Sequence, residues 1–408
     1  MKALAILGST GSIGRQTLQV VESLPERFRV VALAAGANLE ELAGQIGRHR
    51  PELVSVRDAG KAAELRELLG RSSGDPNYSP DIQHGREGLL SVATHPDAAV
   101  VVSAAVGVVG LEATYAAVRA GKQVALSNKE VLVAAGELVM AAAKAKGVEL
   151  LPVDSEHNAI HQCLRAGRHS EVRRLILTAS GGPFRRTPLA QMAQATPEQA
   201  LAHPNWRMGK RITIDSATLV NKGFEVIEAR WLFGMSSNRI DVVIHPQSTI
   251  HSMVEYVDGS ILAQLGPTDM RMPIRYALTY PEREGSNGVA LDWKALRRLD
   301  FEKVPPRKFP CLRLARRALE EGGAQTCALN AADEVAVEAF LERRLPFSGI
   351  AQVIERVLDL MPKVELGSID DVLAADGEAR RLAGHEIDAH GESFASARAR
   401  ASAINRVQ

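Results

Sequence analysis

Two acidic residues stand just after an apolar segment in the middle of the chain, in the run LLPVDSEH at 150–157. In an extended chain, residues two apart point to the same side, so Asp154 and Glu156 can converge on one cation. Carboxylate oxygens are the ligands that Mg²⁺ and Mn²⁺ prefer. The same two residues also suit the start of a helix, which we expect to begin near His157. This segment alone leaves a metal site and an acidic helix cap equally open.

A second pair of carboxylates, Glu225 and Glu228, stands in the run NKGFEVIEA at 221–229. The run is expected to start a helix, on which residues three apart share a face. We expect Glu228 to lie on the solvent side or in a salt bridge. Glu225 is therefore the candidate for a third metal ligand.

Groups that bind anions occur in the same part of the chain. Ser180-Gly181-Gly182 follows an expected strand at 174–178, and its backbone N–H groups can form a phosphate-sized nest or a plain tight turn. Ser216 and Asn221 offer polar side chains, and Lys222 offers a positive charge. Taken alone, each of these three residues is better explained as ordinary solvated surface.

A loop of polar and helix-breaking residues, HPNWRMG at 203–209, contains a single tryptophan, Trp206. Such a loop is typical of a lid that closes over a substrate, although the tryptophan can instead anchor the loop on the core. Lys129, in the run SNKE at 127–130, follows an expected strand of the N-terminal part. We expect it at the edge that faces a cofactor, with an ordinary surface lysine as the alternative.

The run GSTGSIG at 8–14 follows the first expected strand and opens the first expected helix. Glycines there let the backbone approach a pyrophosphate, which the N-terminus of a helix attracts. This position favours a dinucleotide site over a glycine turn without a ligand. The second strand ends in AAGAN at 34–38 without an acidic residue for the ribose hydroxyls, which favours NADPH. Arg57, after the third strand, could reach a 2′-phosphate, but a solvated surface arginine is the better interpretation.

The elements that must position these residues alternate between strand and helix in the N-terminal part. Strands are expected at 3–7, 28–34, 53–56, 100–103 and 123–126, and helices at 13–24, 39–48, 61–69, 111–120 and 131–146. This alternation predicts a parallel sheet covered by helices on both faces. The polar stretch 71–80 is expected to be a surface loop.

The rest of the chain has a different pattern. Strands expected at 174–178, 242–245, 253–257 and 261–265 lie beside helices and indicate an α+β domain. Prolines and fading periodicity at 283–310 indicate a linker, and helical patterns follow at 312–321, 327–344, 348–360, 369–384 and 393–407. The expected fold is α/β, with a Rossmann-like NADPH-binding domain at 1–153, an α+β catalytic and dimerisation domain at 154–282, a linker at 283–310 and an α-helical domain at 311–408.

Composition limits the classes of protein that this chain can be. Its 408 residues are 46% hydrophobic and 24% charged, an ordinary globular balance, and its net charge of +1 argues against a nucleic-acid binder. Cys163, Cys311 and Cys327 form no Cys-x-x-Cys motif, which is typical of reduced thiols in a reducing compartment. The most apolar internal run, at 98–110, is too short to span a bilayer. We therefore expect a cytoplasmic protein without membrane association.

Taken together, these motifs closely resemble the 1-deoxy-D-xylulose 5-phosphate reductoisomerase family over nearly the whole chain. The resemblance rests on GSTGSIG (8–14), SNKE (127–130), PVDSEHNAI (152–160), TASGGPF (178–184), HPNW (203–206), ATLVNKGFEVIEA (217–229), HPQSTIHSMVEY (245–256) and LNAADEVAVEAFL (329–341). It implies a homodimer that uses NADPH and a divalent cation. The implied reaction rearranges and reduces 1-deoxy-D-xylulose 5-phosphate to 2-C-methyl-D-erythritol 4-phosphate in non-mevalonate isoprenoid biosynthesis.

The resemblance also implies a role for each matching residue. It makes Asp154, Glu156 and Glu225 the ligands of Mg²⁺ or Mn²⁺. The implied substrate-binding residues are Lys129, Ser155, Glu156, Ser180, His203, Ser216, Asn221, Lys222 and Glu225, of which Lys129, Glu156 and His203 are also catalytic, together with Trp206 on a flap. The implied NADPH-binding residues are Thr10, Gly11, Ser12, Ile13, Gly36, Asn38, Asn128, Glu130 and Gly209. His157 and His251 would have supporting roles. Ala37 replaces a lysine that is common in the family, so no residue is implied for the 2′-phosphate.

Two other functions fit part of the pattern. A sugar or amino-acid semialdehyde dehydrogenase would share the nucleotide and α+β domains but would need no divalent cation. A dinucleotide-sensing regulator would bind NADPH without consuming it. The crowding of carboxylates and anion donors between 154 and 225 argues against the regulator. The sequence does not distinguish a retro-aldol route from a direct alkyl shift.

Overall fold

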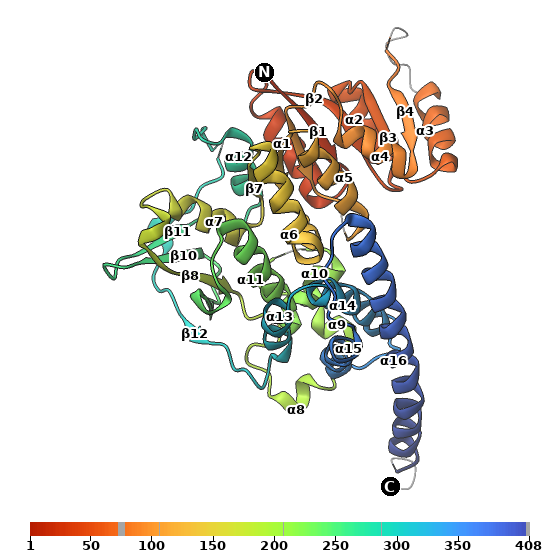
Figure 1. The fold of residues 1–408 in the computed structure, drawn as a ribbon, viewed down its shortest axis with the longest axis vertical. Helices are drawn as coiled ribbons and strands as arrows, with labels where there is room; N and C mark the ends of the chain where they lie inside the picture. Colours follow the sequence, from red (N-terminus) through yellow and green to blue (C-terminus); the bar gives the residue numbers. More distant parts are fainter. Residues whose placement is uncertain (72–77, 106, 207, 287, 405–408) are drawn as a thin grey trace. The chain divides into compact units, whose positions relative to one another are not determined.

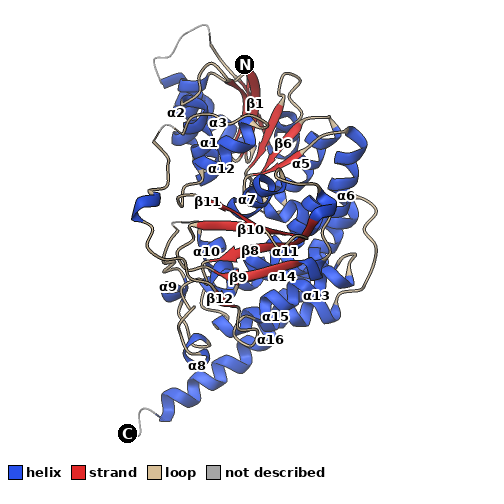
Figure 2. Ribbon diagram, turned by 90° about the vertical axis from the view of Figure 1, so that its left-hand side faces the viewer, coloured by secondary structure: helices blue, strands red, loops and turns tan. Residues whose placement is uncertain are grey.

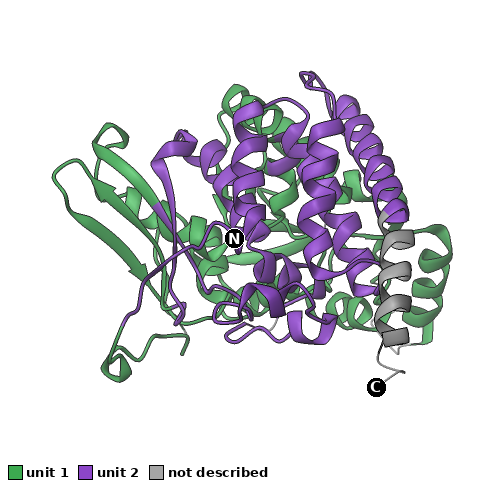
Figure 3. Cartoon of the chain, turned by 90° about the horizontal axis from the view of Figure 1, so that it is seen from below, with its two compact units in different colours: residues 1–132, 136–175, 249–298 green, residues 133–135, 176–248, 299–408 purple. Residues whose placement is uncertain are grey.

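The computed structural model describes residues 1–71, 78–105, 107–206, 208–286 and 288–404, the last fifteen of these as backbone only. The chain divides into two compact units (Figure 3). Unit 1 comprises residues 1–132, 136–175 and 249–298, and unit 2 comprises residues 133–135, 176–248 and 299–408.

Unit 1 contains a seven-stranded sheet in which every pair of neighbouring strands is parallel. The strands are β1 (Lys2–Leu7), β2 (Phe28–Ala34), β3 (Leu53–Val56), β4 (Asp81–His84), β5 (Val100–Ser103), β6 (Gln123–Leu126) and β7 (Leu150–Pro152). Their order is β4-β3-β2-β1-β5-β6-β7, so the chain changes direction across the sheet between β1 and β5. Ligands of such sheets bind beyond the carboxyl ends of the strands at this switch point.

Helices accompany this sheet along the chain (Figure 1). They are α1 (Ser12–Glu22), α2 (Leu39–His49), α3 (Ala59–Arg71), α4 (Gly85–Ala93), α5 (Val109–Arg119), α6 (Lys129–Lys146), α7 (Ser155–Leu164) and, later in the chain, α12 (Arg271–Thr279). The core joins Leu4 and Ile6 of β1 to Leu18 of α1, Leu42 of α2 and Leu278 of α12. The α/β alternation predicted for this part is confirmed. Of the loop expected at 71–80, residues 72–77 lie outside the described residues, and Arg71 belongs to α3.

The second sheet has the order β11-β10-β8-β9-β12 (Figure 2). Its strands are β8 (Val172–Ala179), β9 (Ile240–Ile244), β10 (Ile250–Tyr256), β11 (Ile261–Leu265) and β12 (Glu302–Lys303), and the boundary between the units falls within β8. β10 pairs with β11, and β9 with β12, in antiparallel register. The four strands expected in this region are present, and β12 lies inside the expected linker together with the 3₁₀ turn η3 (Trp293–Ala295).

Helices make up most of the remainder of unit 2 (Figure 3). They are α8 (Leu189–Met192), α9 (Pro197–Ala200), α10 (Lys210–Thr218), α11 (Val220–Phe233), α13 (Pro310–Glu321), α14 (Gln325–Leu341), α15 (Phe347–Leu360) and α16 (Ile369–Ile404). The expectation of two separate terminal helices, at 369–384 and 393–407, is wrong as far as 404, where one helix is continuous, and residues 405–407 lie outside the described residues. Glycines inside a helix cost only about 1 kcal/mol each and need not end it. Within the described part of the chain, no helix combines the length and apolarity that crossing a membrane requires.

Candidate active site

The glycine turn between β1 and α1 has no room for a side chain at two of its positions, Gly8 and Gly14. Gly8 has a left-handed φ of +86°, and a Cβ there would lie 2.5 Å from the carbonyl oxygen of Ala104. A Cβ on Gly14 would lie 2.3 Å from the carbonyl oxygen of Gly8. No side chain caps the N-terminus of α1, which begins after Gly11. The turn therefore presents the backbone N–H groups around Thr10, Ser12 and Ile13, as an anion site at a helix N-terminus requires.

The turn after β2 lies at the same edge of the sheet. Nothing lies within 4 Å of a Cβ built on Gly36, so its open side can accept a ligand. Asn38 has a structural role, because its side-chain oxygen accepts a hydrogen bond from the Glu41 N–H at 3.3 Å and caps α2. The Asn38 amide nitrogen has no such role in the cap, so the predicted contact with NADPH stays open.

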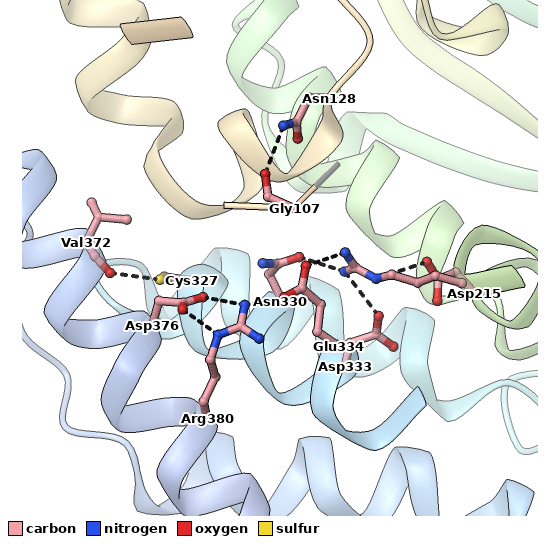
Figure 4. A network of polar contacts seen from close by, with 11 residues as sticks. Gly107, Asn128, Asp215, Cys327, Asn330, Asp333, Glu334, Val372, Asp376 and Arg380 are labelled. Atoms are coloured by element: carbon pink, nitrogen blue, oxygen red, sulfur yellow. Dashed lines mark hydrogen bonds and ion pairs between the residues drawn. The ribbon is translucent and has the colours of Figure 1, made fainter. Parts of the chain in front are cut away.

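Asn128 and Lys129, at the start of α6, are buried. The Asn128 amide nitrogen donates to the Gly107 carbonyl at 2.9 Å (Figure 4). Its Oδ1 is also buried, with no hydrogen-bond partner in the described part of the chain, and is thus free to accept from a ligand. The Lys129 ammonium forms an ion pair with Asp154. Glu130 follows in the first turn of α6.

Asp154 has the helix-capping role that its segment suggested as one of two alternatives. Its Oδ1 accepts hydrogen bonds from the N–H groups of Glu156 at 3.0 Å and His157 at 3.2 Å, which caps α7. Its Oδ2 faces the Lys129 ammonium. The Ser155 hydroxyl donates to Glu156 Oε2 at 2.7 Å. Capping holds the Asp154 carboxylate in one orientation without using its second oxygen, so the cap and a metal-ligand role are compatible.

Two histidines of unit 1 lie behind these carboxylates. His157 is fully buried, with its Nδ1 3.4 Å from Asp154 Oδ1. His251 is buried on β10, and its Nε2 lies 3.3 Å from the carbonyl oxygen of Pro267. Burial lowers the pKa of His251, against the opposing effect of the Glu156 and Asp154 carboxylates. Neither position contradicts the supporting roles expected for these histidines.

In unit 2, the Ser180 turn and the 203–209 loop are joined by a histidine. His203 Nδ1 accepts from the N–H groups of Trp206 at 2.9 Å and Asn205 at 3.2 Å. Its Nε2 must therefore carry the ring proton, which it donates to the Ser180 hydroxyl oxygen at 3.0 Å. Burial lowers the pKa of His203, which keeps the ring neutral in this arrangement. Arg207, within the same loop, lies outside the described residues.

The Ser180 turn also packs closely on α10. Gly182 has φ +63°, and a Cβ there would lie 2.7 Å from the carbonyl oxygen of Ser216. The Ser180 hydroxyl accepts a hydrogen bond from the Gly182 N–H at 3.1 Å. Gly209 is the N-cap residue of α10, and its carbonyl accepts from the Thr213 hydroxyl at 2.8 Å. The structure thus brings together Ser180, His203 and Ser216, which were predicted separately.

The start of α11 carries the acidic group of unit 2. Glu225 is buried, accepts from the Asn221 amide at 2.8 Å and forms an ion pair with Lys222. Asn221 and Lys222 are thus not ordinary solvated surface, since Lys222 is only 3% exposed. Of the two environments expected for Glu228, the solvent side or a salt bridge, the solvent side is wrong, because Glu228 is also only 3% exposed. α11 is covered on several sides, so three-residue spacing does not identify a wet face.

A partly buried ionic network that joins α10 to α14 was not predicted from the sequence (Figure 4). Arg211 forms an ion pair with Glu334, donates to Asn330 Oδ1 at 3.0 Å and lies 3.6 Å from Asp333 Oδ2. Arg380 of α16 also pairs with Glu334. The run LNAADEVAVEAFL contains these α14 residues, and its polar letters inside an apolar helix were the only signal. The network connects the helix that carries Ser216 to α14.

Comparison with known proteins covers nearly the whole chain. Residues 4–136 match the 1-deoxy-D-xylulose 5-phosphate reductoisomerase family, residues 150–233 its C-terminal domain, and residues 265–382 the DXP reductoisomerase C-terminal domain. A 1-deoxy-D-xylulose 5-phosphate reductoisomerase of Symbiobacterium thermophilum is 55% identical over 94% of this chain and 98% of its own length. One from Pseudomonas fluorescens is 50% identical over 95% of this chain and 98% of its own.

Solved structures agree with these relatives. The reductoisomerase of Zymomonas mobilis in complex with NADPH has a TM-score of 0.88 and 44% identity, covering 95% of this chain and 99% of that one. A DOX-P reductoisomerase in complex with NADPH, fosmidomycin and magnesium has a TM-score of 0.89 and 41% identity, covering 95% of this chain and 98% of that one. The resemblance found in the sequence motifs is confirmed. The chain belongs to the 1-deoxy-D-xylulose 5-phosphate reductoisomerase family.

Proposed function

We propose that the chain rearranges and reduces 1-deoxy-D-xylulose 5-phosphate to 2-C-methyl-D-erythritol 4-phosphate, using NADPH and a divalent cation, in non-mevalonate isoprenoid biosynthesis. One observation of unit 1 carries the proposal. The glycine turn follows β1, Lys129 follows β6 and Asp154 follows β7, so all three stand at the carboxyl edge of one parallel sheet. This is where sheets of this kind bind nucleotides and substrates.

The residues of the nucleotide turn fit NADPH. Gly8 and Gly14 have no room for a Cβ, which keeps the backbone of the turn tight, and the N-terminus of α1 has no side-chain cap. The unpaired, buried Oδ1 of Asn128 offers a hydrogen-bond acceptor at the same sheet edge. We assign Thr10, Gly11, Ser12, Ile13, Gly36, Asn38, Asn128, Glu130 and Gly209 to this site.

The acidic residues fit a hard divalent cation. We infer that Asp154 and Glu156 of unit 1 and Glu225 of unit 2 hold Mg²⁺ or Mn²⁺, because this group offers three carboxylates and no soft ligand. Without a cation, lysines balance two of the charges, Lys129 that of Asp154 and Lys222 that of Glu225. A cation bound to these carboxylates would free both ammonium groups for the substrate.

The remaining residues are assigned to the phosphosugar. Lys129 would lie beside its reacting carbons. The residues that would hold the sugar phosphate are Ser155, Ser180, His203, Ser216, Asn221 and Lys222. In this assignment the neutral His203 donates a hydrogen bond, and Trp206, held by His203 through its backbone N–H, closes over the substrate and excludes water. When bound, the cation supplies Lewis acidity and NADPH supplies hydride. In this assignment the Lys129 ammonium would donate a hydrogen bond to a substrate oxygen that gains negative charge.

The proposal is tested by following the loss of NADPH absorbance when 1-deoxy-D-xylulose 5-phosphate is added. We expect rapid loss with Mg²⁺ or Mn²⁺, no loss in EDTA and recovery when the metal is restored. Activity that persists in EDTA would favour a semialdehyde dehydrogenase, and NADPH binding without consumption would favour a sensor.

We also propose that the protein is a cytoplasmic homodimer. β11 stands at the end of its sheet order, and its residues Ile261, Leu262 and Leu265 are exposed although they are apolar. An edge strand of this kind is prone to pair with another chain. The three cysteines are buried free thiols, which suits a reducing compartment.

A further inference from the structure

The turn after β2 has no cation of its own for a 2′-phosphate. In dinucleotide-binding folds the ribose lies beside the end of this strand, and an arginine nearby accommodates the 2′-phosphate of NADP. Here the turn consists of Gly36, Ala37 and Asn38, none of which is charged. The Asn38 side-chain oxygen is occupied in the cap of α2. A positive charge for the phosphate must therefore come from a neighbouring element.

Arg57 is the cation that the sheet places beside this turn. β2 and β3 are paired in parallel with Ala34 opposite Ser55, so the two strands end together. The pairing continues past the strands, because the Ala35 N–H donates to the Ser55 carbonyl at 2.9 Å and the Arg57 N–H to the Gly36 carbonyl at 3.3 Å. The side chain of Arg57 thus starts from a point that is hydrogen-bonded to the nucleotide turn.

One nitrogen of the Arg57 guanidinium donates a hydrogen bond that orients the group, and its two terminal nitrogens remain available to a ligand. Its Nε donates to Asp58 Oδ2 at 3.2 Å, while the other oxygen of Asp58 accepts from the Lys61 N–H at 2.9 Å in the first turn of α3. The Arg57 side chain is 65% exposed, and the described residues provide no partner for its two terminal nitrogens. These terminal nitrogens form the fork that binds phosphate in a bidentate manner.

We propose that Arg57 is the specificity-determining residue that recognises the 2′-phosphate of NADPH, an inference that rests on the proposed function. Arg15 of α1 is the competing cation. It lines a groove between α1 and α2 together with Arg48, Glu22 and Glu41, so that two carboxylates offset the two arginines there. Arg57 has the single carboxylate of Asp58 beside it and a direct backbone link to the turn.

Measurements of nucleotide affinity test the role of Arg57 in 2′-phosphate recognition independently of catalytic activity. Calorimetric titration of the wild type and of Arg57→Ala and Arg57→Gln would use 2′,5′-ADP, which carries the 2′-phosphate, and 5′-AMP, which lacks it. A charged hydrogen-bonded contact of this kind corresponds to about tenfold to hundredfold in affinity. We expect that loss for 2′,5′-ADP and NADPH, with 5′-AMP and NADH unchanged within about twofold.

Arg119→Ala is the matched control, because this exposed arginine ends α5, a helix that leads back to the opposite edge of the sheet. It should bind all four nucleotides as the wild type does. Equal losses for both nucleotide types in the Arg57 variants, no loss, or a selective loss in Arg15→Ala instead would overturn the assignment. A wild type that binds NADPH and consumes it with the phosphosugar separates this failure from failure of the proposed function itself.

Discussion

At the scale of single residues, a substitution of Glu225 can test whether the negative charge of its carboxylate is required, because glutamine has almost the same shape. Glu225→Gln keeps the side chain in the buried position beside Asn221 and Lys222 but removes its negative charge. If Glu225 is a metal ligand, turnover at saturating Mg²⁺ should fall by more than about a hundredfold, beyond the loss typical of outer-shell changes. NADPH binding, measured by fluorescence titration, should stay within about twofold of wild type, because every residue assigned to its site except Gly209 belongs to unit 1.

Glu338→Gln provides the control for this change. Glu338 is an exposed glutamate on α14, also in unit 2, and its loss should leave turnover unaffected. If Glu225→Gln weakens NADPH binding as much as it slows turnover, Glu225 has a general structural role and the metal assignment is wrong.

The residue types of the candidate site were predictable from sequence, but their environments were not. The sequence of Asp154 and its neighbours fits a helix cap and a metal ligand equally well. Only the structure shows that Oδ1 caps α7 while Oδ2 faces Lys129. The burial of Glu228 depends on which elements pack around α11, and the spacing of residues in the sequence does not predict that. The α14 partners of Arg211, Asn330 and Glu334, lie more than 100 residues away in sequence, so their convergence follows from tertiary packing alone.

At the scale of elements, the link between β1 and α1 depends on the absence of one methyl group. Gly14→Ala should destabilise the protein by several kcal/mol, because its Cβ would lie 2.5 Å from Ser9 Cα and would force backbone to move. Gly47→Ala is the opposite case, since nothing lies within 4 Å of a Cβ on this exposed residue of α2. It should stabilise by up to about 1 kcal/mol. Denaturant melts of both variants compare the two effects, and equal shifts would contradict the packing argument.

Elements with strong hydrophobic patterns were predicted well, and those with weak patterns were missed. β2, β3, β5 and β6 were predicted with the bounds that they have, since each is a short apolar run. β4 was missed because its four residues, DIQH, contain one apolar side chain. It is a strand because its backbone pairs with β3, and the residue pattern of the segment itself does not show that pairing.

At the scale of the whole molecule, the exposed face of β11 makes the proposed dimer testable. Charged side chains, lysine above all, are the usual means of keeping an edge strand from pairing. Ile261→Lys should therefore shift the protein from dimer to monomer in light scattering coupled to size exclusion. Leu360→Lys changes an exposed apolar residue of α15 in the same way and should leave the mass unchanged. A monomeric wild type, or a dimeric Ile261→Lys, would remove β11 from the interface.

The pH dependence of the free energy of unfolding should reflect the ionisation of one buried carboxyl group, that of Asp333. Burial raises its pKa to about 7, although Arg211 opposes the rise, and Glu334 adds to it. An unfolded aspartate titrates near pH 3.9, so between about pH 4 and pH 7 the native state holds a proton that the unfolded state has lost. The free energy of unfolding should therefore decrease as pH rises through this window.

Asp333→Asn removes this contribution, so its melting temperature should fall less than that of wild type between pH 5 and pH 7. Asp370→Asn, a change at an exposed position of α16, should follow the wild-type curve, and parallel curves for wild type and Asp333→Asn would show that Asp333 is ionised throughout.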